Sequence, residues 1–216
     1  PSNSNKTFTL EPYDNLTVST TYKTRVTTGV KDTAGNAMSS QYETSSGFTT
    51  CLSSSSGSGV FVAVGNNGSI IRSTDNGTNW CNATSPTNNN LAWGAGITFG
   101  NYTFVAVGTA GTIIRSTDNG SSFDDVTKVD STTLNGVAFG NNTFVAVGAS
   151  GKIVRSTDNG SSWNNPTSGI SQDFQGITFG HNTFVGVGDS GKIVRSTDNG
   201  SNWNNSTSPI TTDLNG

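Results

Sequence analysis

Among the residues that could do chemistry, an arginine recurs at one position of a repeated pattern. Four of the five arginines directly precede a Ser-Thr-Asp-Asn-Gly sequence, and they are Arg72, Arg115, Arg155 and Arg195. A cluster of guanidinium groups could hold an anion, because each presents a planar fork of donors. Equivalent positions also face equivalent neighbours, so each arginine could instead bond a turn or a carboxylate of an adjoining repeat. We favour the second interpretation, since each arginine stands directly before a turn sequence.

The acidic and nucleophilic side chains do not make a catalytic set. Both glutamates, Glu11 and Glu43, precede the repeats, and Tyr102 is the only tyrosine within them. A sialidase needs a tyrosine nucleophile, a glutamate and an acid. Nucleophile–base pairs need a histidine or an equivalent base, and His181, the only histidine, stands where two other repeats have an asparagine in a turn. We therefore expect no catalysis by this segment.

Two aspartates would be enough for an inverting glycosidase. Six aspartates lie among the repeats but outside the repeated turn sequence: Asp124, Asp125, Asp130, Asp173, Asp189 and Asp213. Most of them fall in polar loops, where we expect solvent to cover them.

We expect neither a metal site nor a cofactor. The Asp-Asn-Gly turns lack the further carboxylates of a calcium loop, and two cysteines with one histidine make no zinc site. Cys51 and Cys81 both fall at the first repeat, and later repeats have no cysteine. In an oxidising compartment we expect a disulfide between them, worth on the order of 3–4 kcal/mol in the chain-entropy model.

Four copies of one octapeptide organise the chain after residue 50. The octapeptides are STDNGTNW at 73–80, STDNGSSF at 116–123, STDNGSSW at 156–163 and STDNGSNW at 196–203. Their aspartates are 43, 40 and 40 residues apart. An apolar pair with the arginine precedes each copy, and blocks of the type TFVAVG and GITFG lie further upstream. Each repeat therefore holds four short segments with strand composition, separated by Gly, Asn and Asp turns.

Four strands in about 40–45 residues is the blade period of a β-propeller. One such unit cannot bury both of its faces, so neighbouring copies must stack on each other. We predict an all-β chain in which residues 51–216 form four-stranded propeller blades, with units at about 52–90, 91–130, 131–170 and 171–216.

The octapeptide resembles the Asp-box, or BNR repeat, with the pattern Ser/Thr-x-Asp-x-Gly-x-x-Trp/Phe. The resemblance, which is to sortilin-type and photosystem II assembly propellers, implies that the octapeptide is the hairpin between the third and fourth strands of a blade. It implies a structural role, in which the aspartate accepts backbone N–H groups, the glycine supplies a positive φ and the aromatic ring packs under the blade. The positions concerned are Asp75, Gly77, Trp80, Asp118, Gly120, Phe123, Asp158, Gly160, Trp163, Asp198, Gly200 and Trp203.

Residues 1–50 do not follow the repeat. They resemble the second half of a bacterial Ig-like domain of the S-layer and adhesin type, through Leu16-x-x-x-Thr20-Thr21-Tyr22, VKDTAGNAM at 30–38 and GFTT at 47–50. We expect a partial Ig-like β-sandwich. At the other end, TTDLNG at 211–216 matches STTLNG at 131–136, which leads into a first strand. A fragment of a larger ring, a closed four-blade ring and two chains completing each other all stay open.

Loops that differ between repeats predict a binding surface at the end opposite the octapeptides. The non-repeating aromatic and polar residues there are Trp93, Asp173, Phe174, Gln175 and Asp189. An aromatic platform with polar neighbours suits a sugar or a protein ligand. In the alternative interpretation, Trp93 and Phe174 only fill gaps between blades.

Composition excludes two further classes of function. With 31% hydrophobic and 12% charged residues and a net charge of −3, the chain has no basic surface for nucleic acid. It also has no apolar run of the ~20 residues that a membrane span needs.

We expect a non-enzymatic binding or scaffolding module of a bacterial surface or secreted protein. Its partners would be a glycan or an extracellular protein, and open blade edges would also allow self-association. A carbohydrate-active propeller with catalytic residues outside this segment is one alternative. An assembly factor similar to those of photosystem II is the other.

Overall fold

The computed structural model describes residues 16, 20–45, 48–49, 59–91, 96–126 and 128–216. The chain divides into two compact units. The first unit comprises Pro1–Gly59 and Thr74–Cys81, and the second comprises Val60–Ser73 and Asn82–Gly216. Among the helices of the described part of the chain, none is long and apolar enough to cross a lipid bilayer.

The first unit contains two short antiparallel ladders. Strand β1 (Thr21–Tyr22) pairs with β4 (Phe48–Thr49), and β2 (Arg25–Val26) pairs with β3 (Tyr42–Glu43). Between β2 and β3 the chain turns at Asp32, whose carboxylate accepts hydrogen bonds from the N–H groups of Ala34 and Asn36, both at 2.9 Å. The aspartate thus satisfies the backbone of its own turn.

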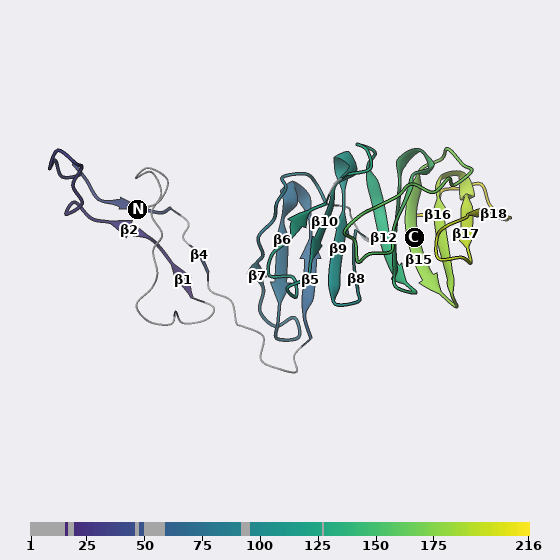
Figure 1. Cartoon of the computed structure of the whole chain (residues 1–216), viewed down its shortest axis with the longest axis horizontal. Coiled ribbons are helices and arrows are strands. Elements are labelled where there is room, and N and C mark those ends of the chain that lie inside the picture. The colour runs from purple at the N-terminus through teal and green to yellow at the C-terminus, as the bar shows by residue number, and fades with distance from the viewer. Residues whose placement is uncertain (1–15, 17–19, 46–47, 50–58, 92–95, 127) are drawn as a thin grey trace. The chain divides into compact units, whose positions relative to one another are not determined.

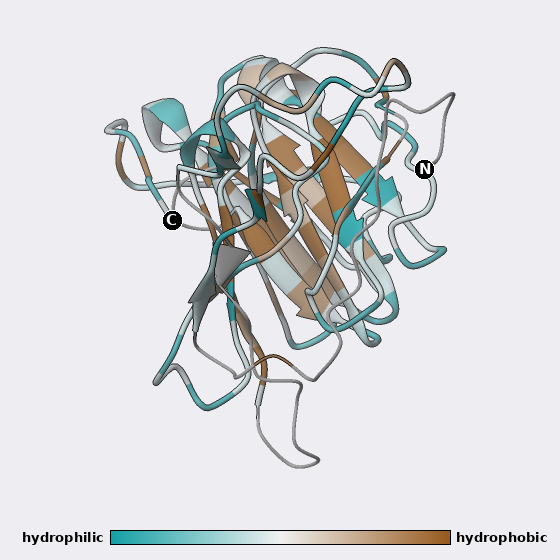
Figure 2. Ribbon diagram, turned by 90° about the vertical axis from the view of Figure 1, so that its left-hand side faces the viewer, coloured by the Kyte–Doolittle hydropathy of each residue, from teal (hydrophilic) through white to brown (hydrophobic). Residues whose placement is uncertain are grey.

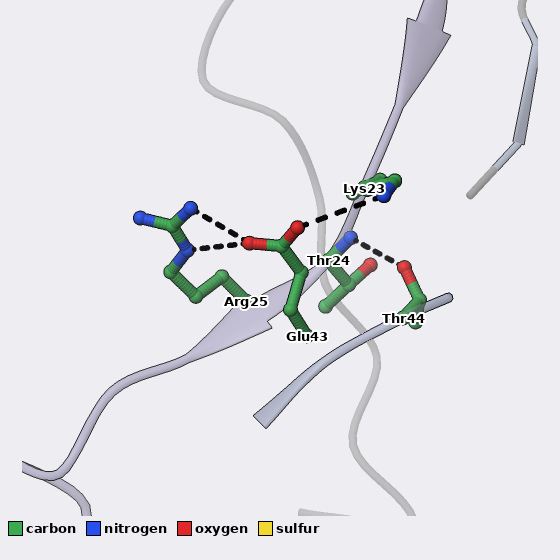
Figure 3. Close-up of polar contacts among 5 residues, drawn as sticks. All are labelled: Lys23, Thr24, Arg25, Glu43 and Thr44. Carbon is green, nitrogen blue, oxygen red and sulfur yellow. Dashed lines mark hydrogen bonds and ion pairs between the residues drawn. The ribbon is translucent and has the colours of Figure 1, made fainter. Parts of the chain in front are cut away.

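An ion pair lies across the ladder of β2 and β3 (Figure 3). The guanidinium of Arg25 contacts one carboxylate oxygen of Glu43 at 2.7 and 2.8 Å, and Lys23 lies 3.8 Å from the other oxygen. Thr24 donates its N–H to the hydroxyl of Thr44 at 3.1 Å. The hydrogen bond and the positive charge of Arg25 lower the pKa of Glu43. Glu43 is therefore an ionised partner in a surface pair.

The second unit is a succession of antiparallel sheets in chain order (Figure 1). The first sheet has β5 (Phe61–Val64), β6 (Ile70–Ser73) and β7 (Cys81–Asn82), and the second has β8 (Ile97–Gly100), β9 (Thr103–Val107), β10 (Ile113–Ser116) and β11 (Asp124–Asp125). The third has β12 (Leu134–Gly140), β13 (Thr143–Gly148) and β14 (Ile153–Ser156), and the fourth has β15 (Phe174–Gly180), β16 (Thr183–Gly188), β17 (Ile193–Ser196) and β18 (Asn204–Ser206).

The all-β prediction is confirmed, and the four-stranded blade is confirmed in part. The second and fourth sheets have four strands. The third has three, and a single bridge between Arg155 and Asn164 stands where a fourth strand would run. The first has three strands among the described residues. No closed ring is seen in the described part of this unit.

Each sheet is a simple meander with one 3₁₀ turn, which joins the first two described strands of the first sheet and the second and third strands of the other sheets. The turns are η1 (Asn66–Gly68), η2 (Thr109–Gly111), η3 (Ala149–Gly151) and η4 (Asp189–Gly191). The glycine that ends each turn has a positive φ, and a Cβ at Gly111 would lie 1.9 Å from the carbonyl oxygen of Asp130. Only glycine allows both the conformation and the close approach.

The core lies between the sheets, so strands inside the stack are buried on both faces. Figure 2 shows the central strands mostly brown and many of the connecting turns teal. One apolar cluster joins each sheet to the next, as where Val145, Val147 and Ile153 of the third sheet pack with Phe184 and Val194 of the fourth. Every residue of β13 is buried, whereas β16, with nearly the same sequence, alternates between buried and half-buried. The difference arises because no described residue of a following sheet covers β16.

Candidate functional site

The octapeptides are turns closed by their own side chains. In the third copy, Asp158 accepts hydrogen bonds from the hydroxyl of Ser156 (2.8 Å) and from the N–H (2.9 Å) and hydroxyl (2.6 Å) of Ser162. The hydroxyl of Ser156 also accepts a hydrogen bond from the N–H of Gly160 at 2.9 Å. The indole N–H of Trp163 donates to the carbonyl oxygen of Gly160 at 3.1 Å. These bonds satisfy the polar groups of the turn from within, so the turn has a structural role.

These hydrogen bonds favour the ionised carboxylate. For Asp158, burial alone would raise the pKa, but the bonds from Ser162 and Ser156 outweigh it and lower the pKa to about 2. In the fourth copy, the N–H and side-chain amide of Asn202 lower the pKa of Asp198 to about 2. Each carboxylate already accepts three hydrogen bonds inside its own turn and is ionised far below neutral pH, so these aspartates are poor candidates for acid–base chemistry.

The repeated arginines bond the octapeptide of the following repeat. Arg72 donates to the carbonyl of Asn119 at 2.6 Å, and Arg155 donates to the carbonyl of Asn199 at 2.5 Å. Arg115 bonds a serine hydroxyl in the third octapeptide. The structure therefore places three guanidinium groups against turns and gathers no anion-binding cluster among the described residues. Arg195, in the last sheet, is exposed and has no such partner.

A second set of bonds joins neighbouring repeats at the same end. Asn101, in the turn between β8 and β9, donates its amide to the side chain of Asn159 at 2.7 Å, and Asn141 does the same to Asn199 at 3.0 Å. His181 holds the equivalent turn position in the fourth sheet, with φ 47° and an exposed side chain. At the octapeptide end, hydrogen bonds between side chains and turns thus join neighbouring sheets.

The opposite end holds a pocket of about 330 Å³ at the start of the first strands. We call it the amide pocket, because four of the residues that line it carry a side-chain amide. Its lining residues are Asn90, Leu91, Thr109, Thr133, Leu134, Asn135, Gln175 and Asn215. Leu91 and Leu134 are almost fully buried and form its apolar part. No charged side chain lines it, which favours a neutral ligand.

Two of the side-chain amides that line the pocket are held by hydrogen bonds that their N–H groups donate. Asn135 donates its amide N–H to the carbonyl of Phe174 at 2.7 Å, and Gln175 donates to the carboxylate of Asp189 at 2.9 Å. The side-chain carbonyl oxygens of Asn135 and Gln175 receive no hydrogen bond from the described residues, and the amide of Asn215 makes none with them. The pocket can therefore accept hydrogen bonds from hydroxyl or N–H groups.

The residues predicted for the binding surface separate into different roles. Gln175 lines the amide pocket and Asp189 orients it. Phe174 is fully buried in the cluster between the third and fourth sheets, as in the gap-filling interpretation. Asp173 accepts the N–H of Ser150 at 2.8 Å and so holds the η3 turn. Trp93 lies outside the described residues.

Sequence reasoning missed Asn90, Asn135 and Asn215 as lining residues. A signal for two of them was present, because the sequences Leu-Asn-Gly, Phe-Gln-Gly and Leu-Asn-Gly stand at 134–136, 174–176 and 214–216. An amide side chain therefore precedes the glycine in these three places.

Aspartates outside the octapeptides also have structural partners. Asp130 pairs with the ammonium of Lys152, whose side chain is only 9% exposed, and this bond lowers the pKa of Asp130 to about 2. Asp213 accepts an N–H of the η4 turn at 2.9 Å, as Asp173 does in η3. Asp124 and Asp125 are exposed in β11. Among the described residues, no group of three or more His, Cys, Asp or Glu side chains could hold a metal ion.

Cys81 is disulfide-bonded. Its expected partner, Cys51, lies outside the described residues, so the pairing stays a prediction. Tyr102 is 83% exposed in the turn between β8 and β9. Among the described residues, no hydrogen bond to its hydroxyl is seen that would activate it as a nucleophile.

Residues 1–50 match the family model of the bacterial Ig-like domain. The match confirms the Ig-like resemblance of this segment and covers less than half of the chain. No curated protein has a sequence that matches this chain.

Solved structures similar to the chain are β-propellers. An ancestral GH74 enzyme has a TM-score of 0.58 and 24% identity, over 69% of this chain and 22% of that one. YCF48 bound to D1 peptide has a TM-score of 0.52 and 18% identity, over 77% and 57%. YCF48 from Cyanidioschyzon merolae has a TM-score of 0.51 and 12% identity, over 69% and 54%. The TM-scores show a shared fold, the low identities show no more than that, and the chain spans less than two thirds of each of these proteins.

Proposed function

We propose that the chain is a non-catalytic, extracellular binding module of a bacterial surface protein, with its ligand in the amide pocket. The observation that carries the proposal is that Asn135 and Gln175 are held by hydrogen bonds at one end of the sheets while their side-chain oxygens accept none from the described residues. The Ig-like family match at residues 1–50 supports a surface protein. The bonding inside the octapeptides supports their assignment as Asp-boxes that maintain the sheets.

The chemistry of the amide pocket favours a neutral glycan. Sugar hydroxyls supply the donors that the oxygens of Asn135 and Gln175 lack. A volume of about 330 Å³ is at the small end for ligand pockets and fits one sugar unit of a longer chain. Without a lining carboxylate, the pocket binds the sugar and does not cleave it.

A peptide segment is the second candidate ligand. Backbone N–H groups are also neutral donors, and the structurally similar YCF48 was solved bound to D1 peptide. The similarity to a GH74 enzyme supports a third arrangement, in which a longer parent chain supplies catalytic groups beyond this segment.

Binding assays on variants of the full chain test the proposal. The wild type is screened against arrayed neutral glycans and against peptides, and the affinity for each hit is measured for Asn215→Ala and Gln175→Ala. Asn215 makes no hydrogen bond with the described residues, so its loss removes ligand contacts without weakening the fold. One neutral hydrogen bond of about 0.5–1.5 kcal/mol corresponds to a roughly 2- to 12-fold loss of affinity.

Asn205→Ala is the control, because Asn205 is an exposed amide in β18, away from the pocket. Loss of glycan binding in the two pocket variants alone supports the proposal. Peptide binding with the same pattern supports the second candidate. The proposed site is rejected by a ligand whose affinity the pocket variants leave unchanged, or by the absence of any hit.

A further inference from the structure

The fourth sheet has an apolar face without a cover. Val185, Val187 and Ile193 are half-buried there. Their equivalents in the third sheet, Val145 and Val147 among them, are completely buried. We call this surface, made by Val185, Val187, Ile193 and Arg195, the trailing face.

Inside the stack, a trailing face is covered by the next sheet in three ways. Apolar residues such as Phe184 and Val194 pack on it. The glycine of the next sheet's octapeptide lies against the first valine of the face, so that a Cβ at Gly200 would lie 2.8 Å from Val145. The arginine bonds the next turn, as Arg155 does at 2.5 Å.

The fourth sheet lacks all three covers among the described residues. The side chain of its own arginine, Arg195, is exposed and makes no hydrogen bond with the described residues. A Cβ at Gly180 would meet nothing within 4 Å, whereas a Cβ at Gly140 would lie 2.2 Å from the ring of Phe179 in the next sheet. The trailing face is therefore shaped for a sheet that would follow it.

The first sheet exposes the complementary surface. Phe61 is 50% exposed and Ile71 is 38% exposed, with Ala63 exposed between them. Their equivalents in the second sheet, Phe104, Ala106 and Ile114, are 0–7% exposed and pack against the first sheet. We call Phe61, Ala63 and Ile71 the leading face. A pocket of about 220 Å³ hollows it beside Ala63 and Ile71.

We propose that a second copy of this chain docks its leading face on the trailing face of the first. The three internal interfaces each join a trailing face to a leading face, and within the described residues these are the two faces that no other sheet covers. At each internal junction FVAV of one sheet faces an Ile-Ile-Arg or Ile-Val-Arg strand of the next, and the proposed contact sets FVGV of the fourth sheet, which keeps both valines, against Ile-Ile-Arg of the first. The contact is head-to-tail, because different surfaces of the two copies meet.

A head-to-tail contact leaves one unmatched face at each end of a dimer. Such assemblies grow into a closed ring or an open chain of copies, depending on the rotation between neighbours. Covering Val185, Val187 and Phe61 removes apolar side chains from water, which drives the association. Arg195 would then find a turn acceptor, as the other three arginines do.

Sedimentation velocity on the full chain tests the proposal, from about 1 to 100 µM, where contacts of micromolar affinity are populated. The wild type should associate with increasing concentration. Val185→Glu and Phe61→Glu should each abolish this, because each places a charge in one of the two faces. Ser171→Glu adds the same charge at an exposed position and should associate as the wild type does. Circular dichroism establishes that each variant is folded.

Mixing the two monomeric variants makes the test specific. The Val185→Glu chain keeps an intact leading face and the Phe61→Glu chain keeps an intact trailing face, so an equimolar mixture should form a heterodimer and nothing larger. A monomeric wild type over the whole range overturns the proposal. So does association that survives either substitution, or a mixture that stays monomeric.

Discussion

A methyl group added at Gly140 tests the packing between the third and fourth sheets. A Cβ there would lie 2.2 Å from the ring of Phe179, whereas ordinary contacts begin at 3.4 Å, so the ring must move by about 1 Å. The ring has little room to move, because the tilted ring of Phe184 packs against it with a centroid distance of 4.6 Å. Overpacking of this kind costs about 1–3 kcal/mol of unfolding free energy. Gly140→Ala should therefore lower the melting temperature by about 2–12 °C.

Gly180→Ala is the matched control. Gly180 is the equivalent residue of the fourth sheet, lies in an extended strand like Gly140, and has open space around its Cα. Alanine restricts the unfolded chain more than glycine, so Gly180→Ala should leave stability unchanged or raise it by up to about 1 kcal/mol.

Thermal and urea denaturation, followed by circular dichroism at about 1 µM to keep the chains apart, measures both variants. The reasoning fails if Gly140→Ala unfolds at the wild-type midpoint, because Phe179 would then not be held against Gly140. It fails equally if Gly180→Ala is as destabilised as Gly140→Ala, because the fourth sheet would then have a cover.

Three further predictions concern polar contacts. Arg155→Ala should lower the unfolding free energy by about 1.5–3 kcal/mol, the range for a hydrogen bond to a charged donor, whereas Arg195→Ala should leave it unchanged in the same urea titrations. Because the pKa of Asp158 is lowered to about 2, its stabilising effect is complete above the unfolded value of about 4 and disappears as pH falls toward 2. Acid titrations of Asp158→Asn should accordingly show a shallower loss of stability than those of the wild type. Asp130→Asn should lower the urea midpoint more than Lys152→Met, because it leaves a buried ammonium unpaired while methionine replaces the pair with an apolar chain; equal midpoints would contradict this.

The repeat made most of the second unit predictable. Octapeptides that share Ser-Thr-Asp-Asn-Gly at a spacing of 40–43 residues predict the same local fold in each repeat, and the sheets follow one another in chain order as expected. The degree of burial was not predictable, because TFVAVG at 143–148 and TFVGVG at 183–188 differ mainly in what lies beside them. Sequence similarity between repeats therefore does not show which strands are covered by another sheet.

The candidate site was predicted less completely. The end opposite the octapeptides and Gln175 were expected to belong to a binding surface, which stays a prediction, and the pocket itself depends on how segments from several sheets converge. Asn90 and Asn215 reach one pocket although they are far apart in sequence. Phe174 shows the opposite case: its aromatic ring differs from the leucine of other repeats, yet it fills the same buried position as Leu134. A change of residue type between repeats can record repacking and need not indicate a ligand.

The arginine bonds give the stack a direction that matters while the chain is being synthesised. Each of the three bonded arginines has its acceptor in the repeat that follows, 47 residues downstream for Arg72 and 44 for Arg155. During translation the donor leaves the ribosome before its acceptor, so the hydrogen bond cannot form until the following repeat has been synthesised. A junction between two repeats is therefore complete only after its second repeat has emerged.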